Sequence, residues 1–288
     1  MTGPVVVGVD GSMSSLTVVE AAAREAGLRG VGLRLAQAVA WPSEPVPSGV
    51  PPWDPDGGGL GEPVNGMLTE AERRARAVAP QVEVTSDVLL GEPMAVLESE
   101  SRLASLTVVD GRGAGRLDGL LRGSVVGHLT AHGCCPVLVV RGRPEPTGPV
   151  VLVDDASPAA REAARFAFAE ASVRGTDLVV LRTRSIRTRS PVGAPVGPRH
   201  GTRGGDGRQP RAAALSVLQK DHADVLVRAR QLAGRAGRAV VEASAGAQLV
   251  VLGAPAMGRR ANVLPGSVGR AALRHAQCPV AVIPGRKV

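Results

Sequence analysis

The feature that most constrains the fold of this chain is an internal repeat within its 288 residues. Residues 4–12, PVVVGVDGS, align without a gap with residues 149–157, PVVLVDDAS, and an alanine-rich amphipathic segment follows each of them. Near the end of each half, GSVVGHLTAHGCCPVLVVR (123–141) aligns with GSVGRAALRHAQCPVAVIP (266–284). A repeat anchored at both ends indicates two copies of one domain, each long enough to bury a core of its own.

The boundary between the copies falls in RGRPEPTG (141–148), whose proline and glycine content is typical of a linker. We therefore place the two domains at residues 1–143 and 147–288. Two further stretches, 41–66 and 185–210, are rich in proline and glycine and occupy the same position in each half. Both are predicted to be flexible loops.

Short apolar runs rich in β-branched residues alternate with helical patterns in both halves. The first half predicts strands at 5–9, 33–39, 82–90, 106–109 and 136–140, with helices from about residue 12 and at 68–79, 94–103 and 124–131. The second half predicts strands near 150–154, 178–183, 224–232, 249–252 and 279–283. This alternation predicts an α/β fold with two tandem open five-stranded parallel sheets, each with helices on both faces.

Charge and cysteine usage limit the classes of partner and the compartment. The formal net charge is +8, carried almost wholly by arginine, a usage that we attribute mainly to a GC-rich coding bias of the kind expected in a bacterial chain. Aromatic residues make up only 1% of the chain, which argues against stacking on single-stranded nucleic acid. Nucleic acid is therefore not an expected partner, although the arginine-rich loop 185–210 would be the place for one. Three cysteines without a disulfide pattern, no signal peptide and no long apolar stretch predict a cytoplasmic protein with no membrane contact.

The chemistry is expected beyond the carboxyl ends of the strands, where ligands bind in open parallel sheets. The first strand ends at Asp10-Gly11-Ser12, and the Asp10 carboxylate can accept hydrogen bonds from a ribose or an adenine edge. Equally, Asp10 and Ser12 can serve only to cap the helix that follows. After the fourth strand, a glycine-rich loop leads to Gly123-Ser124 at the start of a helix, an arrangement that favours a phosphate.

These motifs resemble the universal stress protein family. VGVDGS, the spacing from Gly113 to Gly123-Ser124 and HGCCPVLVVR carry the resemblance in the first half, and SAGAQLVVLG, GSV and RHAQCPVAVI carry it in the second. The resemblance implies a Rossmann-type fold of the adenine nucleotide alpha hydrolase kind and two domains that pack as a pseudo-dimer. In some members of the family it also implies binding of ATP or AMP, with Mg²⁺ accompanying ATP.

By that resemblance, the positions facing a ligand are Gly8, Asp10, Ala38, Val109, Gly113, Gly123, Ser124 and Val125 in the first half. In the second half they are Asp155, Thr183, Leu252, Gly253, Gly266, Ser267 and Val268. Both sites depart from the family pattern. Asp110 stands where the first half should have a glycine, and a carboxylate there repels phosphate. In the second half, Pro255 and Ala256 interrupt the glycine-rich loop, and Ala156 replaces the glycine after the first strand.

The sequence predicts no enzyme and no metal site. It contains no G-x-S-x-G elbow, no H-E-x-x-H helix and no complete G-x4-G-K-[ST] loop. His128 and His132 have the spacing of a metal pair, but the repeat places Ala271 at the position of His128. The expected function is a stress-response regulatory module that binds adenine nucleotide, with one partly degenerate site per domain. The alternatives are an interaction scaffold without nucleotide and a nucleic-acid-associated protein that uses the basic loop.

Overall fold

The computed structural model describes residues 3–39, 61–111, 125–143, 146–155, 159–182, 208–232, 235–254 and 266–285, leaving aside the side chains of 61–65 and 208–214. In the first half the elements are β1 (Val5–Gly8), α1 (Met13–Arg29), β2 (Leu33–Val39), α2 (Gly61–Val78), β3 (Val84–Leu90), α3 (Pro93–Glu100), β4 (Leu106–Asp110), α4 (Val125–His132) and β5 (Val137–Val140). The second half repeats this order with β6 (Val150–Asp154), α5 (Ala160–Val173), β7 (Leu178–Arg182), α6 (Arg208–Asp221), β8 (Val227–Gln231), α7 (Ala236–Ser244), β9 (Leu249–Gly253), α8 (Ser267–His275) and β10 (Val280–Ile283). The predicted alternation of strands and helices is confirmed in both halves.

The ten strands form one continuous sheet in the order β3-β2-β1-β4-β5-β10-β9-β6-β7-β8. Within each half all pairs are parallel, so the predicted five-stranded parallel sheets are both present. The structure adds that the two sheets join edge to edge, because β5 and β10 pair antiparallel. In each half the chain reverses its direction across the sheet between the first and fourth strands, which is where a ligand crevice is expected.

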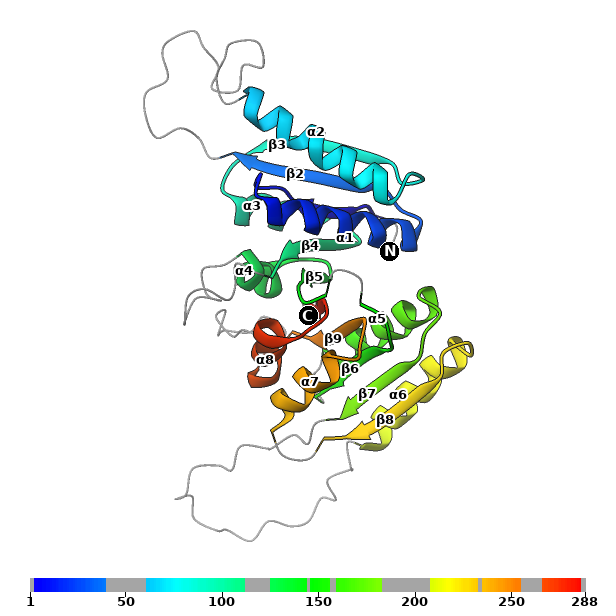
Figure 1. The fold of residues 1–288 in the computed structure, drawn as a ribbon. Coiled ribbons are helices and arrows are strands. Elements are labelled where there is room, and N and C mark those ends of the chain that lie inside the picture. Colours follow the sequence, from blue (N-terminus) through cyan, green and yellow to red (C-terminus); the bar gives the residue numbers. More distant parts are fainter. Residues whose placement is uncertain are drawn as a thin grey trace, which may run out of the picture.

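Helices cover both faces of this sheet (Figure 1). One apolar cluster contains the inward faces of α1, α2 and α5 together with Val5, Val7 and Val150, and α6 packs against it. A second cluster lies on the opposite face and contains residues of α3, α4, α7 and α8. Since each cluster includes residues of both halves, the core is continuous across β5 and β10 instead of being divided into two.

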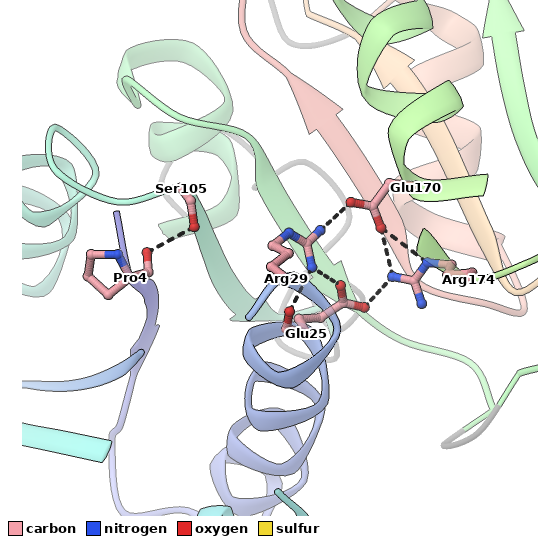
Figure 2. A network of polar contacts seen from close by, with 6 residues as sticks. All are labelled: Pro4, Glu25, Arg29, Ser105, Glu170 and Arg174. Carbon is pink, nitrogen blue, oxygen red and sulfur yellow. Dashed lines mark hydrogen bonds and ion pairs between the residues drawn. The ribbon is translucent and has the colours of Figure 1, made fainter. Parts of the chain in front are cut away.

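A network of four charged side chains joins the halves on the α1 and α5 side of the sheet (Figure 2). Arg29 of α1 pairs with Glu25 of its own helix and with Glu170 of α5. Arg174, directly after α5, pairs with Glu170 at 2.9 Å and with Glu25 at 2.5 Å. All four side chains are at least 85% buried, judged by their relative exposures of 7 to 15%. Burial alone raises the pKa of Glu25, but Arg174 and Arg29 outweigh it and bring that pKa below its ordinary value.

The start of the linker is bound to the second half. Arg141 donates hydrogen bonds to the carbonyl oxygens of Ala276 (2.9 Å), Arg274 (2.5 Å) and Ala272 (3.4 Å), at the C-terminal end of α8. Arg143 donates to the carbonyl oxygen of Ala247 at 3.1 Å. A guanidinium at a helix C-terminus satisfies carbonyl groups that have no partner within the helix. Residues 141–143 belong to the first half but are therefore held against the second half by these hydrogen bonds.

Some predicted boundaries are wrong. α2 begins at Gly61 and α6 at Arg208, so the ends of the predicted loops 41–66 and 185–210 are helical; the remainder of each loop lies outside the described residues. Each helix tolerates a proline in its first turn, where a backbone N–H has no helical partner. The strands predicted from 82 and 224 begin two or three residues later, because Val82 and Val225 each close a turn with the residue three positions before.

Candidate ligand site at the carboxyl ends of the strands

Ser12 shapes the turn at the end of β1. Its hydroxyl accepts a hydrogen bond from the Ser15 N–H at 3.1 Å and thereby caps α1. The Asp10 carboxylate accepts from both the N–H (2.9 Å) and the hydroxyl (2.7 Å) of Ser12. Partial burial raises the pKa of Asp10, but the bonds from Ser12 outweigh it, so that pKa lies below its ordinary value. The turn thus presents an ionised, exposed carboxylate in a defined position.

The predicted positions of the first half gather on neighbouring strands. Gly8 ends β1, Ala38 lies near the end of β2 and Val109 lies near the end of β4, and these three strands are adjacent in the sheet. Gly8 and Ala38 are half-buried, and Val125 begins α4 on the face that carries Val109. The structure therefore brings Gly8, Asp10, Ala38, Val109 and Val125 to one end of the sheet.

At several of these positions, packing within the fold is enough to explain the residue type. A β-carbon on Gly8 would lie 3.0 Å from the Leu97 side chain of α3, so packing alone favours glycine there. The Val109 side chain is only 5% exposed, and Leu252, its equivalent in the repeat, is 3% exposed. Any ligand contact from Val109 or Leu252 would therefore come from the main chain.

In the second half, the residues at the ends of β6 and β9 are packed more closely than their equivalents in the first half. Asp155 follows β6 and is exposed, and Gly253 ends β9. A β-carbon on Gly253 would lie 2.8 to 3.1 Å from atoms of Ala159, the residue before α5. Val153, which is 3% exposed, occupies the repeat position of Gly8. Gly253 is therefore needed for close packing of α5 on β9, which is a role separate from ligand contact.

The start of α8 completes the predicted positions in the second half. Gly266 is the N-cap residue, Ser267 is the first helical residue, and both are exposed. Val268 packs against the same apolar cluster that contains Leu252. The positions predicted at Gly113, Gly123, Ser124 and Thr183 lie outside the described residues, as do Ala156, Pro255 and Ala256.

Sequence reasoning missed a contact at this site. Met67 of α2 lies against Gly11, which has a φ of 77° and sits between Asp10 and Ser12. No local pattern indicates this contact, because Met67 and Gly11 are 56 positions apart in the sequence. It also missed the four-residue network at the centre, for which a signal existed: Glu25 and Arg29 have the same repeat positions as Glu170 and Arg174.

The histidine pair on α4 is held by contacts within the first half. His128 Nε2 lies 2.7 Å from Glu98, and its ring stacks on His132 with centroids 4.5 Å apart. In the described part of the chain no three His, Cys, Asp or Glu side chains are grouped to hold a metal ion. Among the described helices, none is both long and apolar enough to cross a membrane.

Comparison with known proteins identifies the family. The model of the universal stress protein family matches residues 1–141 and again 147–284. Universal stress protein Rv1996 of Mycobacterium tuberculosis is 33% identical, with 96% of this chain and 94% of that protein covered. Universal stress protein Rv2623 of the same species is 32% identical, with 96% and 95% covered. A crystal structure of a universal stress protein from Archaeoglobus fulgidus has the same fold, with a TM-score of 0.68, 15% identity and coverage of 98% of this chain and 96% of that one. This chain belongs to the universal stress protein family and carries two tandem copies of its domain.

Proposed function

We propose that this chain is a regulatory protein that binds an adenine nucleotide in its first half and acts through binding, without catalysis. The observation that carries the proposal is the position of Asp10. Its carboxylate is held by Ser12, is exposed, and lies just beyond the end of β1, where the strand order of the sheet reverses between β1 and β4. A fixed carboxylate acceptor suits a ribose hydroxyl or an adenine N–H donor.

The residues of the first half fit the nucleoside part of such a ligand better than its phosphates. Gly8 has no side chain and Ala38 has a small one, so the ends of β1 and β2 allow close approach of a flat ring. At the end of β4, however, the half-buried Asp110 places a carboxylate where the family pattern has a glycine. Coulomb repulsion there disfavours a bare polyphosphate. We therefore expect AMP to bind at least as well as ATP, and ATP to need Mg²⁺.

The second half supports binding less well. Ala159 closes on Gly253, and Val153 stands at the position of Gly8. One ligand per chain, in the first half, is the expected stoichiometry. We also place the protein in a reducing cytoplasm, which suits its three free cysteines.

The test is a thermal-shift series with AMP, ADP and ATP, with and without Mg²⁺. A ligand at one hundred times its dissociation constant should add about 2.7 kcal/mol to the stability of the state that binds it. Asp10→Asn should reduce this shift, and the matched variant Asp155→Asn, at the same repeat position in the second half, should leave it unchanged. Asp110→Asn removes the negative charge near the expected phosphates and keeps the size of the side chain, whereas Asp110→Gly removes both. Comparing the two variants therefore separates the effect of charge from the effect of size.

The outcomes distinguish the candidate functions. A shift in the wild type that Asp10→Asn reduces supports the regulatory nucleotide site. A shift that appears only after Asp110→Gly would mean a disabled site and a protein that serves as an interaction scaffold. No shift in any variant would reject nucleotide binding.

A further inference from the structure

We propose that Met67 is an oxidation site, and that its conversion to the sulfoxide detaches the start of α2 from the turn that carries Asp10. The proposal begins with the packing at Gly11. A β-carbon on Gly11 would lie only 1.9 Å from Met67 Sδ and 2.9 Å from its Cε. The thioether therefore occupies the space directly over the Gly11 backbone, and no atom can be added to that side of the sulfur without movement.

The segment that Met67 contacts is the one that positions the candidate ligand group. Gly11 adopts a left-handed φ of 77°, which links Asp10 to Ser12. Ser12 in turn caps α1 and donates both hydrogen bonds to the Asp10 carboxylate. A displacement of Met67 thus acts on the support of Asp10, without direct contact with that carboxylate.

The rest of α2 is held by other contacts. Arg74 pairs with Glu20 of α1 at 2.8 Å, and Glu72 accepts a hydrogen bond from Ser86 of β3. Leu68, Ala71 and Ala75 are buried in the apolar cluster under the helix. Among the contacts of the described residues, these anchors lie C-terminal to Met67, so loss of the Met67 contact should act mainly on the first turns of α2.

The Met67 residue is partly exposed to solvent, and this partial exposure would admit a small oxidant. Met67 is half-buried, and Met13, two residues beyond Gly11, is 76% exposed. With hydrogen peroxide, the thioether sulfur of Met67 attacks one peroxide oxygen, an S–O bond forms and the O–O bond breaks. The sulfur loses two electrons, and the other peroxide oxygen leaves as water with both protons. The product is a polar side chain in place of an apolar one, and methionine sulfoxide reductases reverse the change.

The experiment treats the full chain with graded hydrogen peroxide, maps oxidised methionines by peptide mass spectrometry and follows hydrogen–deuterium exchange. Oxidation at Met67 should make exchange severalfold faster in residues 8–15 and 61–70, and sulfoxide reductase should restore it. Met67→Leu keeps an apolar side chain of similar size, so its exchange should not respond to peroxide, although Met13 is still oxidised. Met67→Gln should reproduce the fast exchange without oxidant, whereas Met94→Gln, a half-buried methionine of α3, should not.

Two results would overturn the proposal: Met67 that stays unmodified when Met13 and Met94 are fully oxidised, or Met67 that is oxidised with unchanged exchange around Gly11. A second readout, loss of the nucleotide-induced thermal shift on oxidation, rests on the proposed function. Because the exchange measurement needs no ligand, failure of nucleotide binding and failure of the oxidation proposal are separable.

Discussion

Leu138 of β5 lies in register with Ala281 of β10, the residue at its own repeat position. A pseudo-twofold axis therefore passes between the two central strands and relates α1 to α5 across the same face of the sheet. The charged network obeys the same symmetry, since Arg29 reaches Glu170 and Arg174 reaches Glu25 (Figure 2). The contact between halves is thus built twice from one sequence signature.

Removing one arginine of this network should destabilise the protein strongly. Arg174→Met leaves Glu25 and Glu170 buried with one partner fewer each, and breaking a buried ion pair in this way costs about 3 to 5 kcal/mol. Urea denaturation measures the change in the free energy of unfolding. Arg165→Met is the matched control on α5, because the Arg165–Glu162 pair is largely exposed and should change stability by less than about 1 kcal/mol. Equal effects of the two variants would contradict a special role for the network.

Gln37 offers a substitution that should stabilise the protein. It is 5% exposed, and its Oε1 is buried without a hydrogen-bond partner among the described residues. Because a buried unsatisfied acceptor costs about 1 to 3 kcal/mol, Gln37→Leu should raise the midpoint of thermal unfolding. Gln248→Leu is the control with the opposite sign, since Gln248 donates to the Gly148 carbonyl at 2.6 Å and loses that bond. A lower midpoint for Gln37→Leu would show that the amide has a partner in solution.

The linker contact at Arg141 should be stronger than the one at Arg143. Arg141 makes three hydrogen bonds to carbonyl oxygens at the end of α8, whereas the side chain of Arg143 makes one bond within the described part of the chain, to Ala247. Each bond from a charged donor is worth about 1.5 to 3 kcal/mol at most. Arg141→Ala should therefore lower the denaturation midpoint more than Arg143→Ala, and should speed amide exchange at the end of α8. The reverse order would mean that residues 141–143 are held mainly by Arg143.

The three cysteines should differ sharply in reactivity. Burial raises the pKa of Cys135 to about 11 and that of Cys278 to about 12, while Cys134 is exposed. Since the thiolate is the reactive form, a thiol reagent at pH 8 should modify only Cys134 in the native protein and all three cysteines after unfolding. Native Cys134→Ser should then show no fast reaction. Rapid modification of a second thiol would show that the sheet opens readily at β5 or β10.

The same two buried thiols predict a loss of stability in alkali. Their pKa values are raised above the ordinary 9.0, so the unfolded thiols ionise first and the free energy of unfolding falls as the pH rises from about 9 toward 11 and 12. Below pH 9 this contribution is fully present. The chain has no tyrosine, which limits other titration in that range. Replacing Cys135 and Cys278 by alanine should flatten the dependence measured by thermal melts between pH 8 and 10.5.

Much of the fold could be predicted from the sequence because it depends on local patterns. The apolar β-branched runs and the amphipathic segments between them are read over windows of about ten to eighteen residues, and the repeat shows the same order twice. They gave the right type and order of strands and helices, and they directed attention to the turn at Asp10. Boundaries were less accurate at α2 and α6, where a proline signalled a loop although it lies within the first turn of a helix.

Local patterns and the repeat thus establish two copies of one parallel α/β domain, together with their family. How the copies join becomes visible only in the folded chain, where β5 pairs with β10, four charges meet across α1 and α5, and Arg141 binds the end of α8. The folded chain also brings Ala159 onto Gly253 and Met67 over Gly11. The physical reason is that strand patterns follow from neighbouring residues, whereas edge pairing, ion pairs and close backbone contacts depend on groups far apart in the chain that meet only after folding.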